Sequence, residues 1–180
     1  MSDTIKKYIT SIDIYTDGSL KRTSNGEIYG CGYGIYFPGK ELKNVAASFT
    51  HGQITNNRAE LFAIFQAIVR VVKNYTFDLI NIYTDSQYSQ KSLTVWIKTW
   101  KQNKWLNSQK KPVENQDLLR KIDKYLQRYQ GKINIQWIKA DHGKGKYVHS
   151  HNKGNEKADY LANKGADKYA ASHSKKIEIK

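Results

Sequence analysis

The stretch "SIDIYTDGSL" at residues 11–20 and the stretch "LINIYTDSQY" at residues 79–88 share the tetrapeptide "IYTD". The residues that follow the two copies, "GSLKRTSNGEIYG" and "SQYSQKSLTVWIK", have unrelated patterns, so an internal repeat does not explain the match. Each copy is a mostly apolar run that ends on an acid. We therefore expect two neighbouring strands that deliver Asp17 and Asp85 to the edge of a sheet, where open α/β sheets place their ligand sites.

Strand patterns elsewhere in the chain complete a mixed sheet. Strands at 11–17, 28–37 and 44–50 are joined by short polar loops, which predicts an antiparallel meander. A mostly apolar run at 77–85 follows a helical segment and predicts a strand that is entered by a crossover. Residues 132–138 alternate as a fifth strand. The sequence therefore predicts an α/β (α+β mixed sheet) fold, with three antiparallel strands and then parallel strands.

Helical spacing separates these strands, and we expect helices on both faces of the sheet. Asn56 or Asn57 can cap the first helix, and Gly165 can end the last one. The four predicted helices cover residues 55–75, 85–103, 114–130 and 154–166.

Length and composition predict one intracellular domain. The chain has 180 residues, 39% of them hydrophobic, which suits a single core. No apolar run approaches the length that a bilayer requires, so no membrane association is expected. Cys31 is the only cysteine, which fits a reducing compartment. We expect a cytoplasmic monomer, with a nuclear location possible if the source is eukaryotic.

The charge balance points to a polyanionic partner. The formal net charge is +14, and no acid occurs between Ser86 and Val113. That same segment contains Trp96, Trp100 and Trp105. Its lysines are Lys91, Lys98, Lys101, Lys104, Lys110 and Lys111.

Four acids are candidates for a metal site, although each has an ordinary structural explanation. Asp17 precedes Gly and suits a turn, and Asp85 with Ser86 suits a helix N-cap. Glu60 lies in the first turn of a predicted helix, and Asp159 lies near the start of another. Taken together, four converging acids would repel one another and raise each other's pKa, which divalent cations compensate.

The motifs "YTDGS", "NNRAEL", "TDSQY" and "GNEKADYLA" occur in an order and at separations that resemble the ribonuclease H family, in its single-domain cellular form (type 1). The resemblance runs from Ile12 to Ala166 and includes "WIKTWKQNKWLNSQKKPVENQDLL", the family's basic protrusion. It implies a ribonuclease H-like fold with a catalytic domain at residues 1–167. We interpret residues 168–180 as a basic solvated tail.

The resemblance implies that Asp17, Glu60, Asp85 and Asp159 form the metal-binding and catalytic carboxylate set. Oxygen ligands suit Mg²⁺, with Mn²⁺ possible, and two ions per site can hold a phosphodiester and activate water. The family is an endoribonuclease that hydrolyses the RNA strand of RNA/DNA hybrids, which leaves 5′-phosphate and 3′-hydroxyl ends. The implied partner is therefore an RNA/DNA hybrid.

Nucleic-acid contacts follow from the same resemblance. Thr55 and Asn115 match positions that hold a phosphate of the DNA strand, whereas Gln53 stands where some members have Arg. Selection of RNA requires contacts to the 2′-hydroxyl, a donor and an acceptor, and amide side chains offer both roles. The candidates for these contacts are Asn56, Asn57 and Gln87.

The basic protrusion is expected to grip the DNA strand. Among its tryptophans at 96, 100 and 105, at least one is expected to pack in the core, because Trp at helical spacing is more often core than ligand platform. Trp96 and Trp100 stay candidates for nucleic-acid contact. The candidate phosphate ligands are Lys98, Lys101, Lys104, Lys110 and Lys111.

Histidine is the point at which this chain departs from the family pattern. The family usually has a His on the loop after the last strand, and that loop is about seven residues longer here. His149 lies ten residues before Asp159 and is the favoured proton carrier. His142 directly follows the strand and is an alternative, as is His151 or no histidine at all.

Two other functions compete with the nuclease. A catalytically inactive module of the same fold would bind hybrids without cutting them, but the four intact acids disfavour it. A transposase or integrase-like nuclease would also place acids at strand ends, but "NNRAEL" and the basic segment disfavour that reading.

Overall fold

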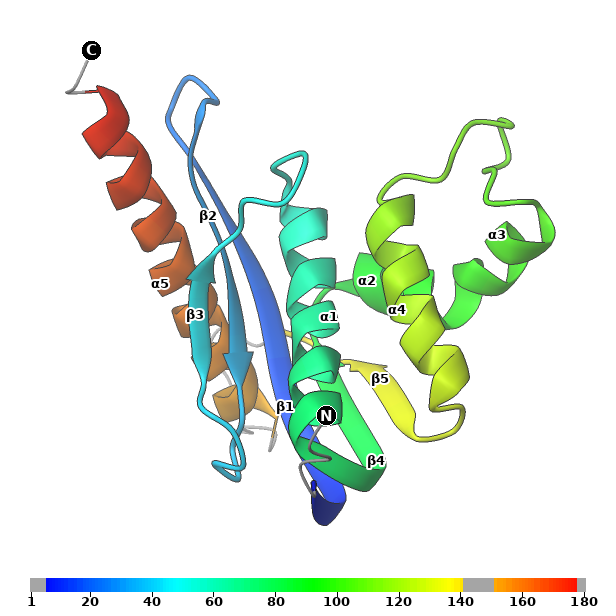
Figure 1. The fold of residues 1–180 in the computed structure, drawn as a ribbon. Coiled ribbons are helices and arrows are strands. Elements are labelled where there is room, and N and C mark those ends of the chain that lie inside the picture. Colours follow the sequence, from blue (N-terminus) through cyan, green and yellow to red (C-terminus); the bar gives the residue numbers. More distant parts are fainter. Residues whose placement is uncertain (1–5, 141–150, 178–180) are drawn as a thin grey trace, which may run out of the picture.

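The computed structural model describes residues 6–140 and 151–177, which form a five-stranded mixed sheet (Figure 1). The strand order is β3-β2-β1-β4-β5. The β1–β2 and β2–β3 pairs are antiparallel, whereas β1–β4 and β4–β5 are parallel, which confirms the predicted meander followed by parallel strands. The strands are β1 (Lys7–Arg22), β2 (Ile28–Tyr36), β3 (Val45–Ser48), β4 (Tyr75–Thr84) and β5 (Ile133–Trp137).

The two "IYTD" copies lie side by side in register. In the parallel β1–β4 pair, Ile14 is opposite Ile82 and Tyr15 is opposite Tyr83. The tyrosine rings stack with their centroids 4.9 Å apart. The sequence identity of the two strands therefore aligns their ends, and it brings the acids that follow, Asp17 and Asp85, to the same edge.

Strand β1 does not end at Asp17, so the predicted turn at "DGS" is wrong. Asp17 pairs with Gly34 of β2, and the pairing continues to Arg22 opposite Ile28. The partner strand supplies the hydrogen bonds that keep the Asp-Gly step extended. Because β4 ends at Thr84, Asp17 lies just beyond the end of the parallel pairing, where one side of β1 has lost its neighbour.

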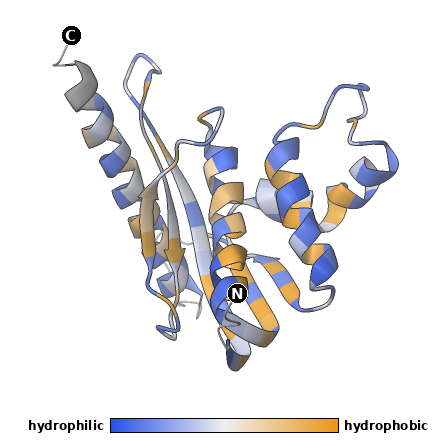
Figure 2. Ribbon diagram, viewed as in Figure 1, coloured by the Kyte–Doolittle hydropathy of each residue, from blue (hydrophilic) through white to orange (hydrophobic). Residues whose placement is uncertain are grey.

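Helices cover both faces of the sheet, as predicted (Figure 1). Alternate residues of a strand point to opposite faces. On β1, Ile14 belongs to the large core with α1 (Asn56–Asn74), whereas Tyr15 packs with Ala158 of α5 (Asn152–Ile177). Figure 2 shows hydrophobic residues along α1 and the central strands, while α4 (Gln116–Arg128) alternates between polar and apolar turns. None of the helices in the described residues is long and apolar enough to span a membrane.

One predicted helix cap differs from the structure, and another predicted helix keeps its cap but is divided. The N-cap of α1 is Thr55, whose side chain accepts a hydrogen bond from Arg58 N, and not Asn56 or Asn57. The extended backbone of Thr55 places its hydroxyl over the first turn. The helix predicted at 85–103 is capped by Ser86 and divided into α2 (Gln87–Lys91), a π-helical turn η1 (Ser92–Trp96) and α3 (Ile97–Gln102).

The last helix is longer than predicted. Helix α5 continues through Gly165 to Ile177, so Gly165 does not end it. A Cβ atom at Gly165 would lie 2.4 Å from the carbonyl oxygen of Ala47, so this glycine permits close packing of the helix on β3. Residues 168–177 continue this helix and Tyr169 packs against the core, while the interpretation of residues 168–180 as a solvated tail stays a prediction. The domain boundary at 167 stays a prediction.

Candidate active site

Three of the four predicted acids form a compact carboxylate cluster. Asp17, Glu60 and Asp85 each offer an oxygen, and these oxygens all lie within 4.8 Å of one another. Asp17 is 6% exposed and Glu60 is 4% exposed, so both charges are largely removed from water. They come from the middle of β1, the first turns of α1 and the residue after β4. Residues distant in sequence therefore meet at the edge where β4 ends.

Gly18 is what allows α1 to approach this edge. A Cβ atom at Gly18 would lie 2.6 Å from the backbone nitrogen of Glu60 and 3.0 Å from the carbonyl carbon of Ala59. Real Cβ atoms do not approach backbone so closely, so any larger residue would push the helix away. The glycine after Asp17 is thus a packing requirement that brings Glu60 to its neighbour.

Burial and mutual repulsion raise the pKa values of the two buried acids. The pKa of Asp17 rises from its ordinary 3.8 to about 7, chiefly through burial and then through the negative charge of Asp85. Burial raises the pKa of Glu60 well above its ordinary value, and the charges of Asp17 and Asp85 add to that rise. Such a site favours either protons or a cation.

The donor set fits a hard divalent cation. Oxygen ligands from carboxylates are those that Mg²⁺ and Mn²⁺ prefer. Glu60 Oε2 is buried, and no residue in the described part of the chain donates a hydrogen bond to it. Asn56 Nδ2 donates a long hydrogen bond of 3.5 Å to Glu60 Oε1. A buried carboxylate with so few protein donors is well suited to a metal ligand.

The fourth acid, Asp159, lies at the margin of this cluster. It is exposed on α5, and its oxygens are outside the group of three that lie within 4.8 Å. Its negative charge nevertheless contributes to the raised pKa of Asp17, so the two carboxylates are close enough to interact. Asp159 is thus a solvent-facing acid close to the cluster.

The family profile of RNase H matches residues 10–167, which is most of the chain. The chain belongs to the ribonuclease H family. It is 38% identical to a ribonuclease H of Methylobacillus flagellatus over 87% of this chain and 91% of that protein. It is 38% identical to ribonuclease HI of Haemophilus influenzae over 87% of this chain and 90% of that protein. Its activity is therefore that of a metal-dependent endoribonuclease acting on RNA/DNA hybrids.

Solved structures agree with this assignment. The solution structure of the PFV RNase H domain matches with a TM-score of 0.66 and 26% identity, over 87% of this chain and 94% of that chain. A foamy viral protease-reverse transcriptase in complex with an RNA/DNA hybrid matches with a TM-score of 0.67 and 23% identity, over 92% of this chain and 22% of that chain. The five-stranded mixed sheet is thus the ribonuclease H fold.

The ribonuclease H site contains three supporting residues that sequence reasoning missed. Asn155 Nδ2 donates to Asp85 Oδ2 at 3.1 Å, and Trp137 Nε1 donates to the Asp85 carbonyl at 3.1 Å. Asn163 Nδ2 donates to Asp159 Oδ1 at 2.9 Å. The i±4 spacing of Asn155 and Asn163 about Asp159 was the available signal, because such residues share one face of a helix.

Of the three candidate histidines, the structure places one. His142 and His149 lie outside the described residues. His151 Nδ1 is 2.8 Å from the hydroxyl oxygen of Tyr15, and its ring is tilted against Tyr83 at 4.4 Å between centroids. Burial raises the pKa of Tyr15 to about 12, so its phenol is neutral at neutral pH. His151 is thus packed on the β1–β4 tyrosine pair.

The predicted phosphate ligands border a common pocket. Thr55 and Asn115 line a pocket of about 350 Å³ together with Gln53, Asn57 and Arg58. Thr55 also caps α1, and Asn115 donates from Nδ2 to the Tyr88 hydroxyl at 2.8 Å. The structure of this ribonuclease H therefore brings Gln53, Thr55 and Asn115 to one pocket.

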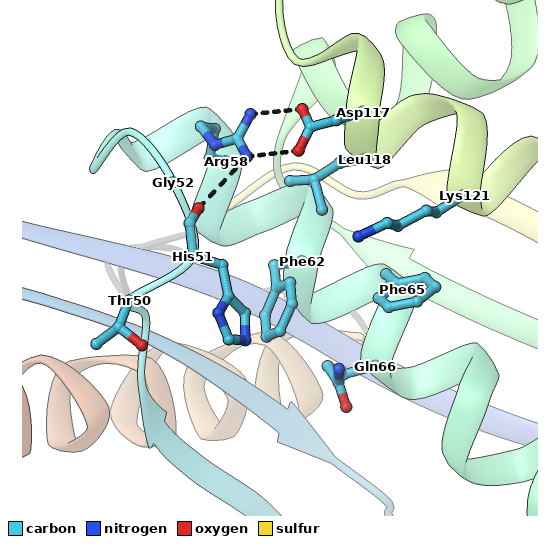
Figure 3. A pocket seen from close by; sticks show the side chains of 10 residues that line it. All are labelled: Thr50, His51, Gly52, Arg58, Phe62, Phe65, Gln66, Asp117, Leu118 and Lys121. Carbon is cyan, nitrogen blue, oxygen red and sulfur yellow. Dashed lines mark hydrogen bonds and ion pairs between the residues drawn. The ribbon is translucent and has the colours of Figure 1, made fainter.

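Arg58 braces the wall of this pocket against α4. Its guanidinium makes two hydrogen bonds of 2.8 Å to the carboxylate of Asp117 and a third, at 3.3 Å, to the carbonyl of His51 (Figure 3). The Arg58 guanidinium lowers the pKa of Asp117. The Arg58–Asp117 pair also lines a second pocket of about 490 Å³, where Lys121 extends beside Phe65. None of the four carboxylates lines that second pocket.

The basic protrusion is partly structural. Trp105 is 8% exposed and packs in the core beneath Arg120, as expected for at least one tryptophan. Trp96 is 38% exposed and lies 5.7 Å from the half-buried Trp100 between ring centroids. Lys101 is ion-paired with Asp123 at 3.0 Å, which weakens its case as a phosphate ligand. Lys101 is exposed, as are Lys98, Lys104, Lys110 and Lys111.

Proposed function

We propose that Asp17, Glu60, Asp85 and Asp159 hold two Mg²⁺ ions, with Mn²⁺ able to replace them, and that this centre cuts the RNA strand to leave 5′-phosphate and 3′-hydroxyl ends. The observation that carries the proposal is the cluster of three acids whose oxygens lie within 4.8 Å, with the pKa of Asp17 raised to about 7. The charge of such a cluster is compensated best by divalent cations.

The carboxylates differ in what they contribute. Buried Asp17 and Glu60 are fixed by the sheet and α1, so they define the position of an ion. Exposed Asp159 has room for water and substrate beside it. When bound, the ions lower the pKa of a coordinated water and stabilise negative charge on the phosphodiester. The protein contributes the orientation of these oxygens and the exclusion of water on the α1 side.

A histidine is proposed as the proton carrier, and His149 is the first candidate. The spacing of ten residues before Asp159 supports it, and His142 is the alternative. His151 is a weaker candidate because its Nδ1 already contacts the Tyr15 hydroxyl. Alanine variants of the three histidines separate these assignments, since loss of the proton carrier lowers kcat and flattens the pH profile.

Amide side chains near the cluster are proposed to select RNA. Asn56 and Asn57 are exposed in the first turn of α1, and Gln87 is exposed two residues after Asp85. Their amides offer both a donor and an acceptor, which a 2′-hydroxyl can satisfy. The 3.5 Å contact between Asn56 Nδ2 and Glu60 Oε1 supports a place for Asn56 beside the carboxylates.

The DNA strand is proposed to contact the other side of the α1 start. Thr55 and Asn115 would hold one phosphate in the pocket that they share with Gln53. Lys98 and Lys104, with Trp96 and Trp100, would contact the strand further along the protrusion, and Lys101 would add charge only if its pair with Asp123 opens. We also propose that the protein acts as a monomer in the cytoplasm, which a sizing column and cell fractionation test.

The deciding experiment compares cleavage of end-labelled RNA/DNA, RNA/RNA and DNA/DNA duplexes of one sequence, with Mg²⁺ and with EDTA. We expect cleavage of the RNA strand of the hybrid alone, only with Mg²⁺, and no cleavage by Asp85→Asn. Product ends are identified by mass spectrometry. Binding without cleavage would instead indicate an inactive hybrid-binding module, and strand transfer into DNA would indicate an integrase-like nuclease.

A further inference from the structure

Helix α5 presents three polar side chains at four-residue spacing toward the active site: Asn155, Asp159 and Asn163. Residues at this spacing lie on one face of a helix. Asn155 donates to Asp85 and Asn163 donates to Asp159, so two of the four carboxylates each accept a hydrogen bond from an amide of the same helix. The helix therefore does more than supply Asp159.

Asn155 holds the carboxylate of Asp85 through a hydrogen bond. It is 8% exposed, and its Nδ2 atom is 3.1 Å from Asp85 Oδ2. The Asp85 carbonyl is held separately by Trp137 Nε1. The backbone and the carboxylate of Asp85 are thus fixed from different elements, β5 and α5. Because Asn155 is buried on a helix, its side chain has few alternative rotamers, and one oxygen of Asp85 is held in place.

Asn163 is oriented by a chain of hydrogen bonds that starts on β1. Ser19 Oγ donates to Asn163 Oδ1 at 2.9 Å, and Asn163 Nδ2 donates to Asp159 Oδ1 at 2.9 Å. Ser19 is buried and lies two residues after Asp17, on the same face of the strand. With its oxygen occupied by Ser19, the amide must present its nitrogen to Asp159. The otherwise exposed Asp159 is thereby tied to the strand that carries Asp17.

We propose that Asn155 and Asn163 are positioning residues that orient Asp85 and Asp159 for metal binding, with Ser19 acting through Asn163. The inference rests on the proposed function of the carboxylates. An amide suits this role because it donates a hydrogen bond to a carboxylate without bringing a positive charge that would repel the cation. Residues that orient metal ligands typically change metal affinity or activity about 10–100-fold when they are removed.

The test measures metal binding directly. Mn²⁺ is titrated into the wild-type protein and into Asn155→Ala and Asn163→Ala by calorimetry and by electron paramagnetic resonance of free Mn²⁺. We expect Mn²⁺ affinity about 10-fold lower in each variant. In hybrid cleavage we expect a higher Mg²⁺ concentration for half-maximal rate and a lower kcat, with little change in KM for the hybrid. Asn74→Ala, at the far end of α1, is the matched control and should leave all these values unchanged.

A double-mutant cycle tests the chain from β1. Ser19→Ala should weaken Mn²⁺ binding in the wild-type background and have no further effect in Asn163→Ala, because Ser19 acts only through that amide. Additive effects of the two substitutions would overturn this part of the proposal. Thermal melting of every variant accompanies the cycle, so that a general loss of structure is recognised. Should Asn155→Ala fail to fold, the less buried Asn163 still carries the test.

The outcomes distinguish this inference from the proposed function. If the wild-type protein cuts hybrids and Asp85→Asn does not, yet both asparagine variants bind Mn²⁺ with wild-type affinity, the positioning role is refuted and the carboxylate site stands. If the wild-type protein itself neither binds Mn²⁺ nor cleaves hybrids, the proposed function has failed first.

Discussion

Asp17→Asn should stabilise the metal-free protein while it abolishes cleavage. The substitution keeps the shape of the side chain and removes one of three charges that lie within 4.8 Å of one another. In the folded protein the pKa of Asp17 is about 7 instead of 3.8. Each pKa unit corresponds to about 1.4 kcal/mol of free-energy difference between the protonated and the ionised form. The ionised carboxylate therefore lowers the free energy of unfolding by about 4 kcal/mol.

The sign of the pH dependence follows from the raised pKa. Below about pH 4, Asp17 is protonated in both the folded and the unfolded chain, and the variant should match the wild type. Between about pH 4 and pH 7 only the unfolded chain loses the proton, so wild-type stability falls. Above about pH 7 the full difference is present. The advantage of Asp17→Asn should therefore grow through this window and then stay constant.

Urea denaturation in EDTA at several pH values measures this advantage, with Glu156→Gln as the control because Glu156 is an exposed acid on α5. Saturating Mg²⁺ should stabilise the wild type and narrow the gap, since the variant has lost a ligand. The reasoning is refuted if Asp17→Asn is less stable than the wild type in EDTA at pH 8, or if the difference does not depend on pH.

Three further predictions follow from the surroundings of the site. Gly18→Ala should cost about 2 kcal/mol of stability and lower kcat, because its Cβ would meet the backbone of α1 at 2.6 Å; urea denaturation and hybrid cleavage measure both effects. Lys98→Ala and Lys104→Ala should each lower the slope of log affinity against log salt concentration by up to about 0.9, as measured by fluorescence anisotropy on a hybrid, and an unchanged slope would remove that lysine from the interface. Asp117→Asn should cost about 1 kcal/mol at neutral pH, and this difference should vanish in acid, because the lowered pKa of Asp117 makes its pair with Arg58 stabilising only while it is ionised.

The strand order of the sheet was predictable because each strand has a recognisable pattern in its own sequence, and the folded structure keeps these segments as strands. The shared "IYTD" predicted that two strands lie in parallel, and the register of Tyr15 opposite Tyr83 confirms it. Asp17 was misplaced at a strand end because Asp-Gly is a turn signal, and only the pairing with β2 keeps that step extended. Pairing partners are not local information, so the extent of β1 could not be read from its own residues.

Helix α5 was the least predictable element for a related reason. Gly165 is a helix-ending signal in isolation, but here it faces Ala47 of β3 and permits close packing. The i±4 spacing places Asn155 and Asn163 on the same helix face as Asp159, but nothing in the sequence indicates that Asp85, just after β4, accepts a hydrogen bond from Asn155. The candidate metal ligands were recognisable from motifs, whereas the residues that we propose to orient them required the fold.

Acids that repel one another stay close only if the strands and helices that carry them are held together, and this site has two such restraints. Repulsion would separate Asp17 and Glu60 if β1 and α1 were free to move apart. The backbone of α1 instead contacts β1 at Gly18, and Arg58 ties the first turn of α1 to α4 through Asp117. The strain therefore stays in the folded state as raised pKa values. A divalent cation bound at the proposed site would release it. Ion binding and folding stability would then be coupled, and each support that holds the acids together would also strengthen their affinity for the ion.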